Sequence, residues 1–477
     1  MNTRAHSIES LLYPRAVAVV GASDNADKVG GRPLRHLITH GFAGRLYPVT
    51  QRGTPVQGLA SYTSLAALPE VPDVAILCVP ADRAGAEIEA CARLGVSHVL
   101  LFSSGFAEVG PAGSARQEAL AEICRRTGIR LLGPNTLGIA NFSNGAVLSF
   151  ASVYLDCPHQ DGPVAVVSQS GGFGAAAYAL LRANDVGVRY VCSTGNQADL
   201  DVAEFVAELA RDESLRVMLI YQEEVKDAAA MRSALEAARR RGIAIIAIVG
   251  GLSSQGARSA TLHTGSTGFD GLSGPQIAAF FREHGCRVAT GLPDLCESVP
   301  LYLGPVGATS SDGIALISNS GASCVIAADA AAALGLPLAT LSPATCATLD
   351  TVLPDFSLNR NPLDLTAMLL ADPGLLGRVM NVALADSAVA AATLGLVAIG
   401  GPSYDLPRFV RETADAVQAS GKPCIVHAPD PRVRQAFTQR GLPVFVSERA
   451  ALEALRDWRN HLTVMAPNLR ADTVAHA

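Results

Sequence analysis

His263 is the residue of this chain best suited to nucleophilic chemistry, because it stands in a segment of small polar residues. Residues 260–268 read Ala-Thr-Leu-His-Thr-Gly-Ser-Thr-Gly. The glycines predict a loop that can move and expose the imidazole, as a group carrier that visits two sites requires. A large fraction of imidazole is neutral near pH 7, so the ring is a workable nucleophile. The spacing by itself leaves open that His263 is an incidental histidine of a polar loop.

Two further features could assist this histidine if they lie beside it. A turn after an apolar run would open a helix, whose N-terminus can hold phosphoryl oxygens. Its residues are Ser168, Gln169, Ser170, Gly171 and Gly172. Glu223 follows the predicted strand 217–221 and could accept a hydrogen bond from one imidazole nitrogen, which leaves the other as nucleophile. Turn chemistry and a solvated carboxylate are the plain alternatives. Together, the three features make His263 a phosphohistidine candidate.

A candidate nucleotide site lies near the start of the chain. The predicted first strand runs into Gly21, Ala22 and Ser23, but the full dinucleotide fingerprint GxGxxG is absent. An NAD site would place Asp or Glu after the second strand, whereas this chain carries Arg52 there. A guanidinium can pair with the ribose phosphate of NADP or with the 3′-phosphate of coenzyme A. A tight turn without a ligand and a solvated Arg52 stay open as alternatives.

These residues fall on the elements of doubly wound α/β modules. Short apolar strands alternate with helical stretches along the chain. Two octapeptides of matching pattern start at Val164 and Ile314, and an offset of one domain length indicates a duplicated flavodoxin-like module. The last residues contain Pro467 and few apolar positions, which is typical of a frayed end. The predicted parts are a Rossmann-like domain over 1–144, two flavodoxin-like domains over 160–303 and 311–460, and a flexible tail over 461–477.

The composition excludes several classes of function. The 477 residues are 49% hydrophobic and 17% charged, so sizeable cores are expected and disorder is not. The net charge of −6, without a dense basic run, argues against nucleic acid as a partner. No apolar run is long enough to span a membrane, and the start of the chain lacks the pattern of a secretion signal, so we expect a cytoplasmic protein. The ten cysteines form no CxxC pair, and we predict no metal site.

Ordered motifs over residues 8–458 resemble those of the NDP-forming acyl-CoA synthetases. The resemblance is to the α subunits of ADP-forming acetyl-CoA synthetase, which are related to the α subunit of succinyl-CoA synthetase. The motifs are Val-Val-Gly-Ala-Ser at 19–23, Tyr-Pro-Val at 47–49, Ser-Ser-Gly-Phe-Ala-Glu at 103–108, Gly-Pro-Asn-Thr-Leu-Gly at 133–138, Ser-Gln-Ser-Gly at 168–171, Gly-Asn at 195–196, Tyr-Gln-Glu at 221–223, His-Thr-Gly at 263–265 and Asn-Pro-Leu-Asp-Leu at 361–365. The resemblance implies a CoA-binding first domain followed by two succinyl-CoA-synthetase-like domains.

The resemblance also implies a reaction. A carboxylic acid, CoA and ATP would be exchanged with acyl-CoA, ADP and phosphate through an acyl phosphate and a phosphohistidine. His263 would carry the phosphoryl group, Glu223 would orient it, and the turn 168–172 would bind phosphate. The residues implied to bind CoA are Gly21, Ala22, Ser23, Lys28 and Arg52, with Pro80 and Asn135 near the pantetheine or acyl end. Arg52 stands where the family commonly has lysine, so the cation is kept.

The family needs an ATP-grasp unit for ATP/ADP and Mg, and the predicted domains leave no segment for it. The resemblance therefore implies a separate ATP-grasp β-type subunit in a hetero-oligomer. Two departures from the family favour instead a CoA- or acyl-CoA-binding module without phosphoryl transfer. Leu262 replaces a serine, and residues 249–252 read Val-Gly-Gly-Leu in place of Lys-Ala-Gly-Arg. A related acyl- or carbamoyl-transfer enzyme is a further alternative. The acid, and the choice between ATP and GTP, stay open.

Overall fold

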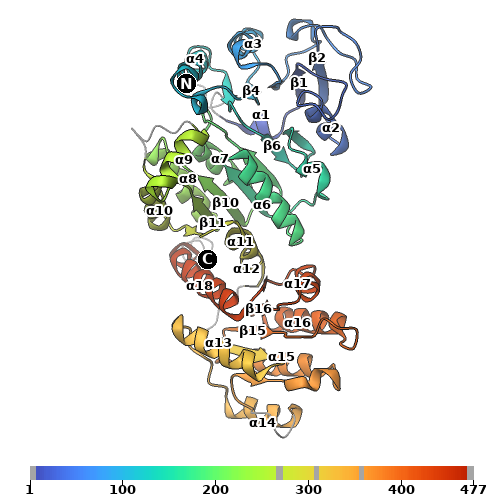
Figure 1. The fold of residues 1–477 in the computed structure, drawn as a ribbon, viewed down its shortest axis with the longest axis vertical. Helices are drawn as coiled ribbons and strands as arrows, with labels where there is room; N and C mark the ends of the chain where they lie inside the picture. Colours follow the sequence, from blue (N-terminus) through green and yellow to red (C-terminus); the bar gives the residue numbers. More distant parts are fainter. Residues whose placement is uncertain (1–6, 265–271, 306–310, 354–358, 470–477) are drawn as a thin grey trace, which may run out of the picture. The chain divides into compact units, whose positions relative to one another are not determined.

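The computed structural model describes residues 7–264, 272–305, 311–353 and 359–469 (Figure 1). They form two compact units. The first holds chiefly the residues up to 295, and the second chiefly residues 296–466. Within these described ranges, no helix combines the length and the apolar character needed to cross a bilayer.

The first sheet of the first unit has five parallel strands in the order β2-β1-β3-β4-β5. Its strands are β1 (Ala16–Val20), β2 (Arg45–Val49), β3 (Val74–Leu77), β4 (His98–Leu101) and β5 (Arg130–Leu132). The accompanying helices are α1 (Glu9–Leu12), α2 (Arg32–Thr39), α3 (Ala81–Leu94) and α4 (Pro111–Thr127), with the 3₁₀ turns η2 (Leu65–Ala67) and η3 (Ala107–Val109). Strands β1, β3 and β4 are buried along their whole length, which accounts for their continuous apolar runs.

The second sheet has seven strands in the order β12-β11-β10-β8-β9-β6-β7. They are β6 (Gly138–Asn141), β7 (Ala146–Ser149), β8 (Val164–Ser168), β9 (Tyr190–Ser193), β10 (Val217–Gln222), β11 (Ala244–Val249) and β12 (Arg287–Val288). The helices are α5 (Val153–Asp156), α6 (Gly171–Ala183), α7 (Val202–Leu209), α8 (Ala228–Arg240), α9 (Ser254–Thr264) and α10 (Gly274–Glu283). Strands β8 to β12 are parallel, whereas β6 is antiparallel to β7 and β9.

The hairpin β6–β7 belongs to the second sheet, and the predicted domain boundary at residue 144 falls inside it. Ile139 and Leu148 of the hairpin share one hydrophobic core with Val19 of the first sheet. The hairpin thus packs against residues of the first sheet while it pairs within the second. This tertiary packing, which no local pattern encodes, decides where the hairpin pairs. The first two sheets lie in one compact unit. The division of the chain into three separate domains stays a prediction.

The second unit contains a parallel sheet in the order β14-β13-β15-β16-β17. Its strands are β13 (Ile314–Ser318), β14 (Leu363–Asp364), β15 (Ala391–Gly395), β16 (Cys424–His427) and β17 (Val444–Phe445). The remaining helices are α11 (Leu292–Glu297), α12 (Val299–Leu303), α13 (Gly321–Ala333), α14 (Pro343–Val352), η4 (Thr366–Leu370), α15 (Leu375–Ala385), α16 (Leu406–Ser420), α17 (Pro431–Thr438) and α18 (Glu448–Leu469).

The five parallel strands β8 to β12 and the five strands β13 to β17 follow the same order. In each set the second strand lies on one side of the first, and the third, fourth and fifth lie on the other. The two matching octapeptides form the first strand and the start of the following helix, α6 or α13. The predicted α/β fold, with a Rossmann-like start and a duplicated flavodoxin-like module, is confirmed.

Helix α18 continues to Leu469, where the sequence pattern predicts a flexible tail from residue 461. Trp458, His461 and Met465 are buried at spacings of three and four residues, so one face of the helix stays packed. The Tyr302 hydroxyl lies 2.9 Å from Nδ1 of His461 and holds the same stretch. The tail is therefore ordered further than predicted, and residues 470–477 lie outside the described part.

His36 of α2 is packed inside the first unit, next to the ring of His40, which directly follows the helix. His36 is fully buried, and neither of its ring nitrogens has a hydrogen-bond partner among the residues that the structure describes. Its ring stacks on that of His40 at a centroid distance of 6.1 Å. Burial, together with the nearby His40 and Arg32, lowers the pKa of His36 to about 4. The folded protein therefore holds this imidazole neutral.

We predict that the free energy of unfolding of the chain falls as the pH is lowered from 6.5 toward 4. The unfolded chain protonates His36 near its ordinary pKa of 6.5, whereas the folded chain does so only near 4, so the unfolded state binds more protons in this window. One such group contributes about 1.4 kcal/mol per pH unit. Urea unfolding at three pH values across the window measures the slope.

The variant His36→Leu should lose that share of the slope. Some slope will remain, because burial also lowers the pKa of His98 to about 4. His284→Gln is the matched control, since the His284 ring is only partly buried and bonds to a main-chain oxygen of its own helix. A slope that His36→Leu leaves unchanged would contradict the prediction.

Candidate functional site

Three side chains meet at the carboxyl end of β10. The Nδ1 atom of His263 lies 2.8 Å from Oε1 of Glu223, and the Tyr221 hydroxyl donates to the same oxygen at 2.7 Å. The Glu223 side chain is 3% exposed, whereas that of His263 is 50% exposed. The structure thus brings together the two residues that the motifs single out, and it adds Tyr221, which sequence reasoning missed as a member of the site.

The buried carboxylate sets the protonation of the imidazole. The hydrogen bond to Glu223 raises the pKa of His263, although burial acts to lower it. A carboxylate offers acceptors only, so Nδ1 carries the proton and, in the neutral ring, Nε2 keeps its lone pair. Burial and then the bond to Glu223 raise the pKa of Tyr221, so the phenol remains a donor. The arrangement presents an oriented nucleophile at the protein surface.

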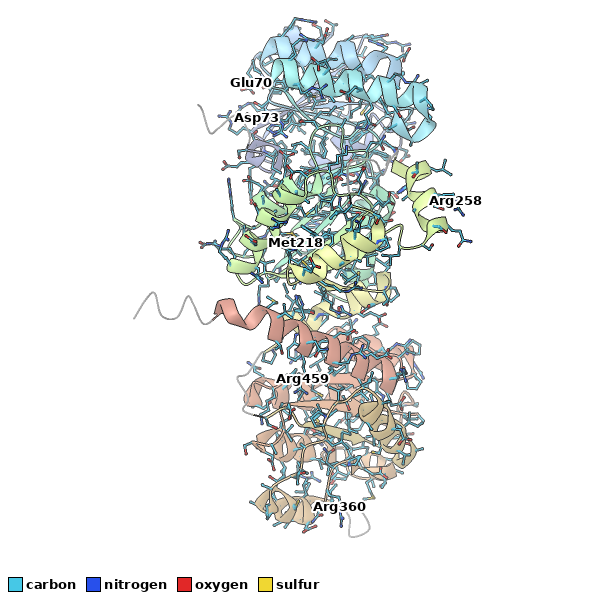
Figure 2. The ribbon with its side chains drawn as sticks, turned by 90° about the vertical axis from the view of Figure 1, so that its left-hand side faces the viewer. Glu70, Asp73, Met218, Arg258, Arg360 and Arg459 are labelled. Atoms are coloured by element: carbon cyan, nitrogen blue, oxygen red, sulfur yellow. The ribbon has the colours of Figure 1, made fainter. Side chains whose placement is uncertain are left out.

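His263 lies in the last turn of α9, which corrects the prediction of a loop at this position. The helix starts where the Ser253 hydroxyl accepts the N–H of Gly256 at 3.0 Å, a capping bond that the glycines of this segment do not indicate. None of residues 254–263 is buried. Figure 2, in which Arg258 marks the helix, shows α9 at the surface of the first unit. The glycines at 265 and 268 lie outside the described residues.

Gln169 ties the turn after β8 to the main chain of Glu223. It is 2% exposed, and its Oε1 accepts the main-chain N–H groups of Glu223 and Glu224 at 2.9 and 3.1 Å. Phe173, in the first turn of α6, stacks on the ring of Tyr221 at a centroid distance of 4.4 Å. The predicted phosphate-binding turn is therefore in contact with the residues that orient His263.

The hydroxyls of this turn shape its backbone. Ser168 donates to the carbonyl oxygen of Ser170 at 2.6 Å, and the Ser170 hydroxyl accepts the N–H of Phe173 at 3.4 Å. The N–H groups of Gly171 and Gly172, at the start of α6, have no acceptor in the described part of the chain. They are donors available to an anion.

A pocket of about 430 Å³ opens at the carboxyl ends of β1, β2 and β3. Its lining includes Gly21, Thr50, Ser64, Cys78, Pro80 and Arg83. Gly21 has a φ of 79°, and a Cβ there would stand 2.4 Å from the carbonyl oxygen of Cys78, so the position requires glycine. Ligands of α/β sheets bind at this edge.

The main-chain N–H groups after β1 are already used, contrary to what the strand–glycine–helix pattern predicts. Those of Gly21 and Ala22 donate to the carbonyl oxygen of Val49 at 3.0 and 3.2 Å, and that of Ser23 donates to Gly30 at 3.1 Å. Helix α2 begins well beyond them. The loop therefore supplies shape at the pocket and no free N–H groups from these three residues.

Positively charged side chains near the start of the chain are available to an anionic ligand. Lys28 and Arg52 are exposed, and in the described ranges neither side chain has a hydrogen-bond or ion-pair partner. Arg83 lines the pocket and was not predicted, although its place shortly after β3 was a usable signal. Thr63 and Ser64 were missed because they come from an irregular segment that no periodicity marks.

Asn135 lies just after β5, outside the residues that line this pocket. It has a φ of 57°, and its Nδ2 donates to Oδ1 of Asn196 at 3.2 Å. The predicted CoA residues are thus divided. Gly21 and Pro80 line the pocket, Asn135 belongs to a separate polar network, and the lining does not include Ala22, Ser23, Lys28 or Arg52.

Residues 15–141 match the family described as CoA binding domain, and residues 161–302 match the one described as succinyl-CoA ligase like flavodoxin domain. The α subunit of acetate–CoA ligase (ADP-forming) I from Pyrococcus furiosus is 33% identical over 368 residues, which cover 76% of this chain and 77% of that protein. The chain belongs to the ADP-forming acetate–CoA ligase family. The family resemblance predicted from the motifs, to the NDP-forming acyl-CoA synthetases, is confirmed.

Other members of this family agree. Acetate–CoA ligase (ADP-forming) I from Archaeoglobus fulgidus is 36% identical over 75% of this chain, and the chain spans about half of that protein, the matched part being 50% of it. Among solved structures, acetyl-coenzyme A synthetase 1 of Ca. Korarchaeum cryptofilum, in complex with phosphate and ADP, superposes with a TM-score of 0.86 at 26% identity. The match covers 98% of this chain and 99% of that one.

The two departures from the family lie close to the histidine site. Leu262 is 76% exposed, so its replacement of serine changes the surface of α9 and not the contact with Glu223. At Gly250, an added Cβ would stand 3.0 Å both from Cγ of Glu223 and from the Tyr221 hydroxyl. Glycine at position 250 therefore leaves space for the hydrogen bond between the Tyr221 hydroxyl and the Glu223 carboxylate.

We predict that Glu223→Gln lowers the pKa of His263. The wild-type carboxylate raises that pKa, and a neutral amide removes this attraction while burial, which lowers the pKa, stays. NMR titration of the imidazole resonance, assigned by its loss in His263→Ala, measures both values. Glu213→Gln, at a carboxylate that is 86% exposed, is the matched control. An equal pKa in wild type and Glu223→Gln would show that the bond does not hold in solution.

Proposed function

We propose that this chain is the α-type half of an NDP-forming acyl-CoA synthetase, which converts a small carboxylic acid, CoA and ATP to acyl-CoA, ADP and phosphate. The observation that carries the proposal is the 2.8 Å contact between His263 and Glu223, in a chain of the acetate–CoA ligase family. It supplies what a phosphoryl carrier needs, an imidazole with one nitrogen held and the other free.

The reaction proceeds in three exchanges. Nε2 of His263 attacks the terminal phosphorus of ATP, and the bond to the ADP oxygen breaks. A carboxylate oxygen of the acid attacks that phosphorus, the N–P bond breaks, and an acyl phosphate forms. The CoA sulfur, having lost its proton to solvent, attacks the acyl carbon, and phosphate leaves. Each exchange has the same form, displacement at phosphorus or carbon by an oriented nucleophile.

Glu223 and the start of α6 serve this cycle in different ways. Phosphorylation of Nε2 leaves a proton on Nδ1 and a positive ring, which the Glu223 carboxylate compensates. The free N–H groups of Gly171 and Gly172 would hold phosphoryl oxygens, with the helix dipole favouring their charge. Both are contributions to positioning and electrostatics, which dominate phosphoryl transfer.

CoA would bind at the pocket of the first sheet. Gly21, Ala22 and Ser23 form the turn beside it, and Pro80 lines it. The exposed cations Lys28 and Arg52 would pair with the CoA phosphates. Asn135, by the family resemblance, would lie toward the acyl end.

We propose that an ATP-grasp β-type partner supplies the binding of ATP/ADP and Mg. The relatives from Pyrococcus furiosus are named as α subunits, whereas the relative from Archaeoglobus fulgidus is about twice as long as the part that this chain matches. None of residues 254–263 of helix α9 is buried, so the His263 ring is accessible to a phosphoryl donor bound on a partner. A heteromer is the expected working form.

Incubation with an ATP-grasp partner and labelled ATP should place an acid-labile, base-stable phosphate on the chain. His263→Ala should abolish the label, and Glu223→Gln should reduce it by about tenfold or more, since a mispaired buried group costs roughly 1–3 kcal/mol. His284→Ala is the control and should label fully. A label that survives in His263→Ala would place the phosphate on another residue and reject the mechanism.

A second candidate function is CoA binding without phosphoryl transfer. The exposed Leu262 and the loss of the family's cations at 249–252 favour it. It predicts that the wild-type chain binds CoA but takes no label from ATP with any partner, so the same experiment separates the two functions.

We predict that Arg52→Ala weakens binding of CoA by about tenfold, the effect of one lost charge-assisted contact. Binding of 3′-dephospho-CoA should be unaffected if Arg52 pairs with the 3′-phosphate. Isothermal titration of both compounds measures the difference, with Arg35→Ala as a control on the neighbouring helix α2. Equal weakening toward both compounds would assign Arg52 to another part of CoA.

A further inference from the structure

A chain of polar side chains links the loops that follow β4, β5 and β9 in the first unit. Oε1 of Glu108 accepts the main-chain N–H groups of Gly105 and Phe106 at 2.5 and 3.1 Å, and its Oε2 accepts from Nδ2 of Asn196 at 2.6 Å. Oδ1 of Asn196 in turn accepts from Nδ2 of Asn135 at 3.2 Å. Asn135 therefore donates to Asn196, and Asn196 donates to Glu108.

The charge of Glu108 sets this order. Burial acts to raise its pKa, but the bonds from Asn196 and the backbone lower it, so the group is a carboxylate. Because a carboxylate only accepts, Asn196 must turn its NH₂ toward Glu108 and its oxygen toward Asn135. Asn196 is 3% exposed, and the same NH₂ also donates to Gln117 at 3.0 Å. The orientation of the Asn135 carboxamide thus follows from a charge two side chains away.

Asn135 occupies a place where a ligand is expected. It follows β5 in the left-handed conformation, at the carboxyl edge of the CoA-binding sheet. Its Oδ1 and its second N–H have no partner among the residues described. Glu108 itself lies in η3, which lies beside α9, the helix whose last turn contains His263. The network thus adjoins both the sheet that carries the CoA pocket and the helix of the histidine.

We propose that Glu108 is a positioning residue for acyl transfer, which acts through Asn196 to aim the carboxamide of Asn135 at the acyl group. This inference rests on the proposed function. The second N–H of Asn135 donates to the acyl carbonyl oxygen, which gains negative charge as the CoA sulfur attacks the carbon and phosphate departs. Glu108 touches no reacting atom, and its effect is confined to this step.

The test compares two steps in the complex with the ATP-grasp partner. One is thioester formation from CoA and acetyl phosphate, and the other is labelling of His263 by ATP. Glu108→Gln sets an amide NH₂ against that of Asn196, which must turn over and then loses its bond to Asn135. Thioester formation should slow by about tenfold, the effect of one mispaired buried group, while labelling stays unchanged.

The reciprocal change provides a rescue that a purely structural role would not show. Asn196→Asp alone sets its carboxylate against that of Glu108 and should slow thioester formation. Glu108→Gln combined with Asn196→Asp restores the order, because the glutamine NH₂ donates to the aspartate, which accepts from Asn135. The double variant should recover to within about threefold of wild type. Glu118→Gln, at a side chain that is 70% exposed on α4, is the matched control and should keep the full rate.

Three results would overturn the inference: a wild-type rate for Glu108→Gln, an equal loss in both steps, or no recovery in the double variant. If Glu108→Gln does not fold, Asn135→Ala carries the test, because it leaves the bonds of Glu108 to Gly105, Phe106 and Asn196 in place. It should slow thioester formation alone, and a full rate would overturn the inference. A wild-type complex with neither label nor thioester would instead overturn the proposed function, and the inference with it.

Discussion

The buried carboxylate of Glu223 is the constraint on which the histidine site depends. The Glu223 side chain is 3% exposed, and burying its charge costs free energy unless hydrogen bonds satisfy the carboxylate. Tyr221 and Nδ1 of His263 both bond to Oε1, and Gln169 holds the main-chain N–H of the same residue. The need to satisfy one desolvated oxygen therefore also selects the imidazole tautomer and anchors the end of an otherwise exposed helix.

Parallel topology brings these groups to one edge. Strands β8 and β10 are neighbours, with Ser168 paired to Tyr221, so the turn that opens α6 and the residue that follows β10 lie side by side. The second unit repeats the strand order, but there Ser318 pairs with Gly395. The two modules therefore share the strand order and the strand–turn–helix start. The phenol that bonds to the carboxylate, that of Tyr221, has glycine at the corresponding position of the second module.

The first sheet uses its backbone differently from a dinucleotide-binding fold. The N–H groups of Gly21 and Ala22 close the loop onto Val49, so they are spent on local structure. Glycine at position 21 is required by the close approach of Cys78, which shapes the pocket wall. These N–H groups are therefore not free for an anionic ligand, whereas the exposed cations Lys28 and Arg52 lie in loops that follow β1 and β2.

The sequence by itself determined the alternation of strands and helices, the duplicated module, the family, and the pair His263 and Glu223 as the residues to examine. Each is a local pattern, a periodicity or a short motif, and needs no knowledge of which segments meet. Only the tertiary structure decided that Tyr221 bonds to the Glu223 carboxylate and Gln169 to the Glu223 main chain. It also decided that the hairpin β6–β7 joins the second sheet and that the N–H groups of the loop after β1 are used within the first sheet and its loops. These features depend on burial and on hydrogen bonds between residues distant in the chain, whose partners are chosen by desolvation in the folded core and leave no trace in local spacing.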